Sequence, residues 1–168
     1  MTPTLSFGRA LKRFTEAQKD FEKAISLNPQ RSDCFYELGY VFFDQELYMQ
    51  ARMFFDMAVQ RDSKTPQYFS MRAMSNYRLQ QYEAAIADYN QALALKPDTP
   101  HYYWNMAYSY WDLDRYAECA QMYTEYIRLM PDEAKAYEER AEVWDAMNRA
   151  DLAAKDRAKA KRLGGAKK

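Results

Sequence analysis

Aromatic and small residues alternate along most of the chain at spacings of three and four. In residues 82–96 the order is Tyr82, Ala85, Tyr89 and Ala92. These spacings put side chains on one face of an α-helix. The pattern predicts helices whose buried face alternates large and small side chains, so that a large residue of one helix enters the space beside a small residue of its neighbour.

The same pattern returns every 34 residues. Aromatic residues that open a helix are followed by small residues three positions later and by aromatics again after four more. The members of these series are Phe14, Tyr48, Tyr82 and Tyr116; Ala17, Ala51, Ala85, Cys119 and Ala153; and Phe21, Phe55, Tyr89 and Tyr123. A second helix in each period carries an aromatic residue, then a small residue four positions later: Phe35 and Gly39, Phe69 and Ala73, Tyr103 and Ala107, Tyr137 and Ala141. A 34-residue helix–turn–helix period predicts a repeat array.

Prolines mark the boundaries in the same step. Pro29, Pro97 and Pro131 end helices, and Pro66 and Pro100 stand where helices begin. We expect one array over residues 1–163, with a partial repeat 1–31, repeats 32–65, 66–99 and 100–133, and a terminal repeat 134–163. Gly164 and Gly165 should stop the last helix, leaving residues 164–168 as a flexible tail. Gly39 should have a packing reason, the close approach of the second helix of its block.

The blocks resemble tetratricopeptide repeats (TPR). The stretch from Tyr82 to Pro97 fits the second helix of that family at nearly every signature position, and Phe35, Leu38, Gly39 and Phe42 fit the first helix. The resemblance covers about residues 9–163. It implies an all-α fold, a right-handed α-solenoid of stacked antiparallel helix pairs with about four and a half repeats.

The chain departs from the family pattern in a few places. Pro3 and Gly8 stand where the first helix of the first block would be, so we expect most of that helix to be missing. Arg72 and Arg140 replace a usual Leu. The last helix, about residues 151–163, is strongly charged, as the open end of a solenoid requires.

The resemblance also implies that the first helices line a concave groove in which partners bind. The groove-facing positions give a predicted peptide-binding set: Tyr36, Glu37, Tyr40, Met71, Met74, Tyr77, Trp104, Asn105, Tyr108, Trp111, Glu138 and Glu142. Its middle is aromatic and Met-rich, as binding hot spots are. Its C-terminal end is acidic, with Glu138, Glu139, Glu142 and Asp145 against Lys135. Such a groove should attract an apolar or aromatic peptide segment with basic residues at one end.

Two alternative interpretations stay open. Tyr36, Phe43 and Tyr77 could pack between neighbouring first helices, and the acidic positions could form a solvated helix face. The family's carboxylate clamp for acidic C-terminal tails does not fit, because among its Lys and Asn positions only Asn105 matches.

Little in the sequence supports catalysis. His101 is the only histidine and stands beside Pro100 at a helix start. There is no Cys/His cluster with metal-ligand spacing and no Gly-rich phosphate loop. We therefore predict a protein that is not an enzyme and uses no cofactor or metal.

Composition narrows the class of partner. The 24 basic and 24 acidic residues balance, which argues against a nucleic-acid binder that relies on a strong overall field. No apolar run approaches the roughly 18 residues of a membrane span, and the N-terminus lacks the apolar core of a signal peptide. Cys34 and Cys119 stand in different frames of the repeat, which predicts unpaired thiols and a cytoplasmic location.

The leading prediction is a non-catalytic protein–protein interaction scaffold with a peptide-binding groove. The alternatives are a structural or weakly self-associating assembly module, through an apolar surface around Leu5, Phe7 and Leu11, and an accessory TPR domain of a larger protein. The basic segment 155–168 could contact an acidic membrane, RNA or the acidic groove end of another copy, or it could be a solvated cap.

Overall fold

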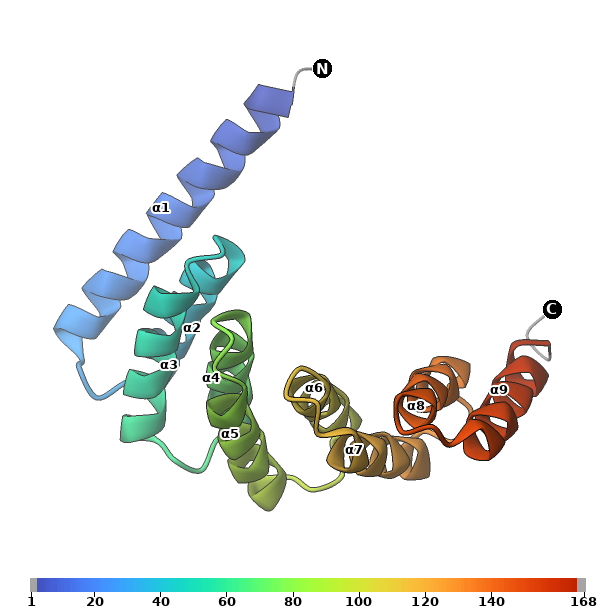
Figure 1. The fold of residues 1–168 in the computed structure, drawn as a ribbon. Coiled ribbons are helices and arrows are strands. Elements are labelled where there is room, and N and C mark those ends of the chain that lie inside the picture. Colours follow the sequence, from blue (N-terminus) through green and yellow to red (C-terminus); the bar gives the residue numbers. More distant parts are fainter. Residues whose placement is uncertain (1–2, 166–168) are drawn as a thin grey trace. The chain divides into compact units, whose positions relative to one another are not determined.

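The backbone that the computed structural model describes, residues 3–165, consists of nine α-helices joined by short turns, without a strand (Figure 1). Side chains are described for residues 14–164. The helices are α1 (Pro3–Leu27), α2 (Ser32–Asp44), α3 (Tyr48–Arg61), α4 (Pro66–Arg78), α5 (Tyr82–Leu95), α6 (Pro100–Trp111), α7 (Tyr116–Leu129), α8 (Ala134–Ala146) and α9 (Ala150–Gly165).

The helices group into two compact units, residues 1–80 and residues 81–168. In the first unit α1 packs on α2, α2 on α3 and α3 on α4; in the second, each helix from α5 to α9 packs on the next. The all-α fold of stacked helix pairs is therefore as predicted. The single array over residues 1–163 stays a prediction.

The turns inside the helix pairs repeat in step. Glu46, Gln80, Asp114 and Asn148 have positive φ angles of 60°, 60°, 56° and 57°, and they stand 34 residues apart. The amide after the turn residue closes the preceding helix, as when Leu47 N donates to Phe42 O at 3.0 Å. Helices commonly end on such a left-handed residue, usually a glycine. Here none of the four is glycine; Asp114 and Asn148 are of types that adopt this conformation readily, whereas Glu46 and Gln80 are not, so the sequence marks only two of the four turns.

Small residues at matching positions allow the close packing that the pattern predicted. Ala51, Ala85, Cys119 and Ala153 are all fully buried. At Gly39, an added Cβ would lie 2.7 Å from the ring of Phe55 on α3. This confirms the expected reason for a glycine inside α2, because the second helix of the same block approaches it too closely for a side chain.

The same ring contact occurs within each of the two units. Phe43 meets Tyr48 with ring centroids 5.2 Å apart at 66°, and Trp111 meets Tyr116 with the same distance and angle. Each pair joins the end of a first helix to the start of the second helix in its block. The 34-residue frame therefore fixes side-chain geometry as well as helix boundaries.

Both ends of the helical region differ from expectation. We expected Pro3 and Gly8 to lie outside a helix, but α1 runs without a break from Pro3 to Leu27. A proline fits there because the first turn of a helix needs no amide donor. Gly164 and Gly165 are the last residues of α9, so the helix runs through both glycines instead of stopping before them. Residues 166–168 and the side chains of Leu5, Phe7 and Leu11 lie outside the described residues.

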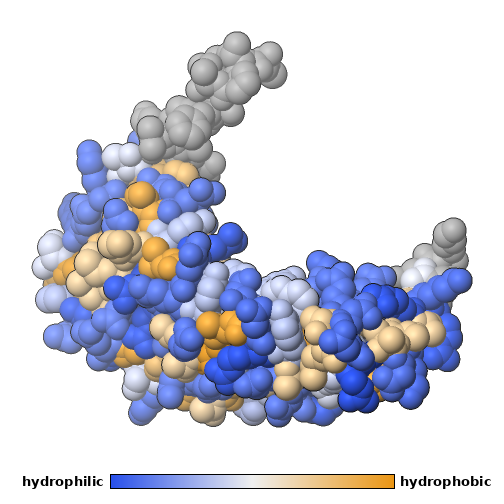
Figure 2. Space-filling model, in the orientation of Figure 1, coloured by the Kyte–Doolittle hydropathy of each residue, from blue (hydrophilic) through white to orange (hydrophobic). Residues whose placement is uncertain are grey.

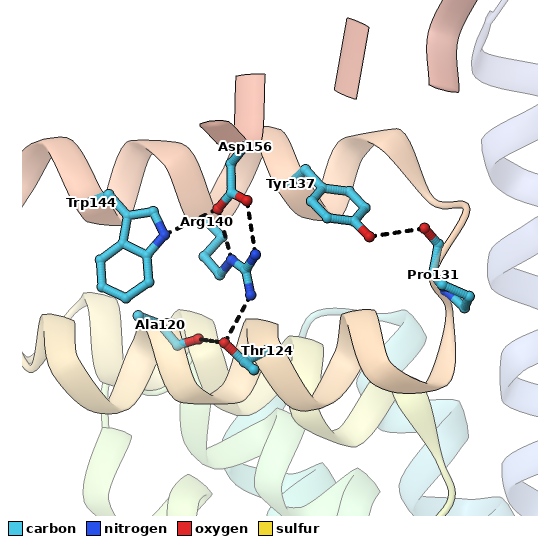
Figure 3. A network of polar contacts seen from close by, with 7 residues as sticks. All are labelled: Ala120, Thr124, Pro131, Tyr137, Arg140, Trp144 and Asp156. Carbon is cyan, nitrogen blue, oxygen red and sulfur yellow. Dashed lines mark hydrogen bonds and ion pairs between the residues drawn. The ribbon is translucent and has the colours of Figure 1, made fainter. Parts of the chain in front are cut away.

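A buried charge network joins α8 to α9 and α7 (Figure 3). Arg140 donates from Nε and from a terminal nitrogen to the two oxygens of Asp156, both at 2.8 Å, and its other terminal nitrogen donates to Thr124 Oγ1 at 2.9 Å. Trp144 Nε1 adds a third hydrogen bond to Asp156, at 3.0 Å. Arg140 replaces the family's Leu because the last helix supplies a buried carboxylate to pair with it.

The outer surface is mostly hydrophilic, with apolar residues in scattered patches on the face drawn in Figure 2. Exposed large apolar side chains include Met49, Met53, Leu95 and Met130. None of the described helices is long and apolar enough to cross a membrane.

Candidate functional site

A pocket of about 240 Å³ opens in the second unit between α6, α7 and α8. Its lining consists of Tyr108 and Trp111 from α6, Tyr123 from α7, and Glu139, Glu142 and Val143 from α8. Tyr108, Trp111 and Glu142 belong to the predicted peptide-binding set. Tyr123, which we had assigned to the core alone, and Glu139 and Val143 were not in that set.

The aromatic walls are held by other rings. Trp111 packs edge-on against Tyr116, whose hydroxyl donates to Asp114 Oδ1 at 2.6 Å. On the opposite side, Trp104 makes edge contacts with Tyr108 and Tyr123, with centroids 6.1 and 5.4 Å apart. The walls are therefore fixed before any ligand arrives, which reduces the entropy lost on binding.

Tyr123 lines the pocket and is only 2% exposed. Its hydroxyl donates to Glu139 Oε2 at 3.4 Å. Burial and the neighbouring Glu139 carboxylate raise the pKa of Tyr123 well above that of a free tyrosine. The phenol therefore stays protonated at neutral pH and acts as a donor to the carboxylate.

The carboxylates at this end of the unit differ in their partners. Glu139 Oε1 lies 3.7 Å from Lys135 Nζ, and Asp145 pairs with Arg157 of α9. Glu138 and Glu142 are exposed, and neither forms an ion pair within the described part of the chain. The two carboxylates that we had selected for attracting positive charge are thus the ones that remain available for it.

The other predicted residues of the second unit lie beside the pocket. Trp104 is half-buried against Tyr126, with Lys135 Nζ 5.6 Å from its ring. Asn105 is half-buried too, and its backbone carbonyl accepts a weak hydrogen bond from Ser109 at 3.5 Å. Trp104 therefore supports the pocket walls, while Asn105 lies on α6 outside the lining.

In the first unit the predicted residues fall into two groups. Tyr40 is 40% exposed and Glu37 is exposed as well, while Tyr36, Met74 and Tyr77 are half-buried. Met71 is less exposed than these residues, at 8%, and packs in the core with Ala51 and Phe55. All six predicted residues of this unit stay in the peptide-binding set as predictions.

Several ring contacts explain why Tyr36 is half-buried. It lies 5.8 Å from Tyr40, 5.7 Å from Phe55 and 5.1 Å from Tyr68, measured between ring centroids. Phe43 also packs against the same core cluster. For these two residues the structural interpretation left open above describes at least part of their role.

The histidine and the cysteines lie outside the pocket lining. His101 is exposed at the start of α6, against Tyr102 at 4.4 Å, and partial desolvation and Lys96 lower its pKa. Cys34 and Cys119 are buried free thiols, and burial raises the pKa of Cys119 to about 12. Among the described residues no group of three His, Cys, Asp or Glu side chains could hold a metal ion.

Solved structures share the fold along nearly the whole chain. A crystal structure of MamA superposes with a TM-score of 0.88 at 20% identity, covering 95% of this chain and 93% of MamA. MamA 41-end from Desulfovibrio magneticus RS-1 gives 0.85 at 16% identity, covering 95% and 92%. YrrB, described as a TPR protein with an unusual peptide-binding site, gives 0.81 at 16% identity, covering 94% and 81%. At these identities the likeness establishes the fold alone.

Sequence comparison identifies the repeats themselves. A search of curated protein sequences finds no match. Three family models match: a tetratricopeptide repeat over residues 9–66, a TPR repeat over residues 75–114, and a tetratricopeptide repeat over residues 100–133. Together they span residues 9–66 and 75–133, more than half of the chain. The chain belongs to the tetratricopeptide repeat family.

Proposed function

We propose that this chain is a non-catalytic protein-interaction module that binds a peptide segment of a partner protein on the surface formed by α6, α7 and α8. The observation that carries the proposal is the pocket lined by Tyr108, Trp111 and Glu142. Aromatic side chains supply much of the energy at protein interfaces, and an unpaired carboxylate selects positive charge. The expected partner segment is apolar or aromatic with basic residues beside it.

Two further observations support this function. YrrB, which shares the fold, is described as having a peptide-binding site. The described pocket lining carries the carboxylates Glu139 and Glu142 but no Ser, Cys, Lys or His beside them.

The two buried free thiols favour a reducing compartment, so we place the protein in the cytoplasm.

The test is selection of a displayed library of 12-residue peptides on the full chain. We expect enriched peptides that combine aromatic or aliphatic residues with Lys or Arg. Tyr108→Ala and Trp111→Ala should each weaken the binding of these peptides by about tenfold, as loss of a hot-spot side chain does. Fluorescence anisotropy of labelled peptides measures the change.

Met130→Ala is the matched control, because Met130 is 42% exposed at the end of α7 and does not line the pocket. Its binding should equal that of the wild type, and thermal unfolding of all variants excludes loss of structure as the cause. If the selected peptides bind Tyr108→Ala and Trp111→Ala as tightly as the wild type, the peptide site is elsewhere and the proposal is wrong.

A further inference from the structure

The pocket combines two features that rarely favour the same neutral ligand. Tyr108, Trp111 and Tyr123 present aromatic surfaces, and Glu139 and Glu142 present carboxylates from one side of α8. An apolar ligand would remove these carboxylates from water without compensation, which is unfavourable. A cation with a partly apolar or planar body satisfies both features, since it stacks on the rings and pairs with the carboxylates.

The repeat frame shows why the pocket is acidic here. Two periods earlier, Met71 and Met74 stand where Glu139 and Glu142 stand, and Phe55 stands where Tyr123 stands. In the first unit Met71 is buried against Phe55, with Met74 packed on the same cluster. In the second unit Glu139 remains 23% exposed. The second unit therefore has two carboxylates beside its pocket at positions where the first unit has apolar side chains packed on the core.

The carboxylate geometry favours a guanidinium over an ammonium. Glu139 and Glu142 are three residues apart on one helix, so their side chains lie on the same face. The planar guanidinium has five donors and stacks on aromatic rings, whereas an ammonium is compact and strongly hydrated. The chain already stacks its own arginines in this way, with Arg61 3.8 Å from the centroid of Phe35 and Arg115 4.7 Å from that of Tyr110.

We propose that the pocket between α6, α7 and α8 binds one arginine side chain of the partner, with its guanidinium between the rings of Tyr108 and Trp111 and the carboxylate of Glu142. The assignment rests on the proposed function and specifies the residue that anchors the peptide. Glu142 supplies the main ion pair, because Glu139 is already engaged by Tyr123 and Lys135.

The experiment titrates the ¹⁵N-labelled full chain with N-acetyl-L-argininamide and follows the indole N–H signals of the tryptophans. The chain has three of these signals, and Trp111→Phe identifies the one at the pocket. Trp144 serves as the internal reference because its indole is bound to Asp156. The arginine probe should shift the Trp111 signal saturably, with a dissociation constant on the order of millimolar, as expected for a single side chain. N-acetyl-L-citrullinamide, which has nearly the same shape but no charge, should leave the Trp111 signal unshifted.

Two variants locate the ion pair. Glu142→Gln should weaken binding of the arginine probe by about tenfold, the loss expected when a charged hydrogen-bonding partner is removed. Glu138→Gln removes an equal charge one turn away on α8, outside the lining, and should change binding by less than about twofold.

The assignment is overturned if the citrulline probe binds as tightly as the arginine probe, or if Glu142→Gln binds the arginine probe as tightly as the wild type. It is also overturned if the Trp111 signal does not shift at probe concentrations up to about 50 mM, well above the expected dissociation constant. The proposed function fails separately. If selected peptides depend on Tyr108 but bind equally well after Arg-to-citrulline replacement, the peptide site is supported and the arginine assignment is wrong. If the pocket binds the arginine probe but no selected peptide depends on Tyr108, the pocket binds arginine and the proposed peptide-binding function is wrong.

Discussion

Replacement of the Arg140–Asp156 pair by two methionines should leave the protein about as stable as the wild type, although each single replacement is strongly destabilising. Asp156 is only 9% exposed and accepts three hydrogen bonds, two from Arg140 and one from Trp144. The chain itself contains the apolar alternative. One period earlier, Met106 and Met122 hold the positions of Arg140 and Asp156.

The magnitudes follow from what each change leaves behind. Loss of one partner of a buried ion pair costs about 3–5 kcal/mol, because the other charge remains without compensation. Asp156→Met falls at the lower end, about 3 kcal/mol, since Arg140 keeps its bond to Thr124 and is 15% exposed. Arg140→Met leaves a buried carboxylate with only the Trp144 hydrogen bond, so we expect about 4 kcal/mol. The double variant removes both charges and should lie within about 1 kcal/mol of the wild type.

Urea unfolding followed by circular dichroism measures the four free energies of the double-mutant cycle. Hydrogen exchange of the α9 amides is recorded as well, because terminal repeats can open separately from the rest of an array. The control is Arg157→Met, which breaks the exposed pair between Arg157 of α9 and Asp145 of α8 and should change the free energy of unfolding little, because exposed ion pairs contribute little. The reasoning fails if Asp156→Met is as harmless as Arg157→Met, or if the double variant is as unstable as the sum of the two singles.

Three further predictions concern single positions. Gly39→Ala should destabilise the chain by about 1–3 kcal/mol in urea unfolding, despite better helix propensity, because the new Cβ overlaps the Phe55 ring; an unchanged or higher stability would contradict this. Gln80→Gly should raise the melting temperature by relieving about 1 kcal/mol of left-handed strain, whereas Asn148→Gly should change it little because asparagine tolerates that conformation; equal effects would show that strain does not decide the difference. Cys119 should react with a thiol reagent at pH 8 only as fast as the chain opens, since burial raises its pKa from the ordinary 9.0 to about 12; rapid labelling of the folded protein would refute this. The same shift implies that the contribution of Cys119 to stability is complete below pH 9 and is lost as the pH rises through 12.

The helices and their frame were predictable because they depend on one repeated property, the size of the buried side chain. Every block must bury the same face, so the sequence repeats the requirement at fixed positions. Gly39 could be explained from sequence for the same reason, since its position faces the second helix of its own block.

The missed features depend on pairs of residues or on backbone conformation. Asp156 was interpreted as part of a polar cap, because nothing within its own helix reveals that it faces Arg140. The left-handed turn at Gln80 was missed because it lacks the glycine that usually marks it. A comparison between blocks would have revealed the ion pair, since the positions of Arg140 and Asp156 are both apolar one period earlier.

The candidate site was half predictable for a related reason. Tyr108, Trp111 and Glu142 were chosen from groove-facing positions, and they line the pocket. Tyr123 was assigned to the core because its position repeats a buried aromatic, and it is in fact both buried and part of the lining. A side chain with two roles cannot be identified from a periodic pattern, which assigns one role to each position.

This double role decides which substitutions can test recognition. Tyr123 supports the second unit and also lines the pocket, so loss of binding in a Tyr123 variant could reflect a loosened core as much as a lost contact. Glu142 is exposed and has no ion-pair partner among the described side chains, so its removal should alter binding with little effect on stability. The two properties are separated along α8, where Ala141 is fully buried in the core while Glu142, the next residue in sequence, is exposed and lines the pocket.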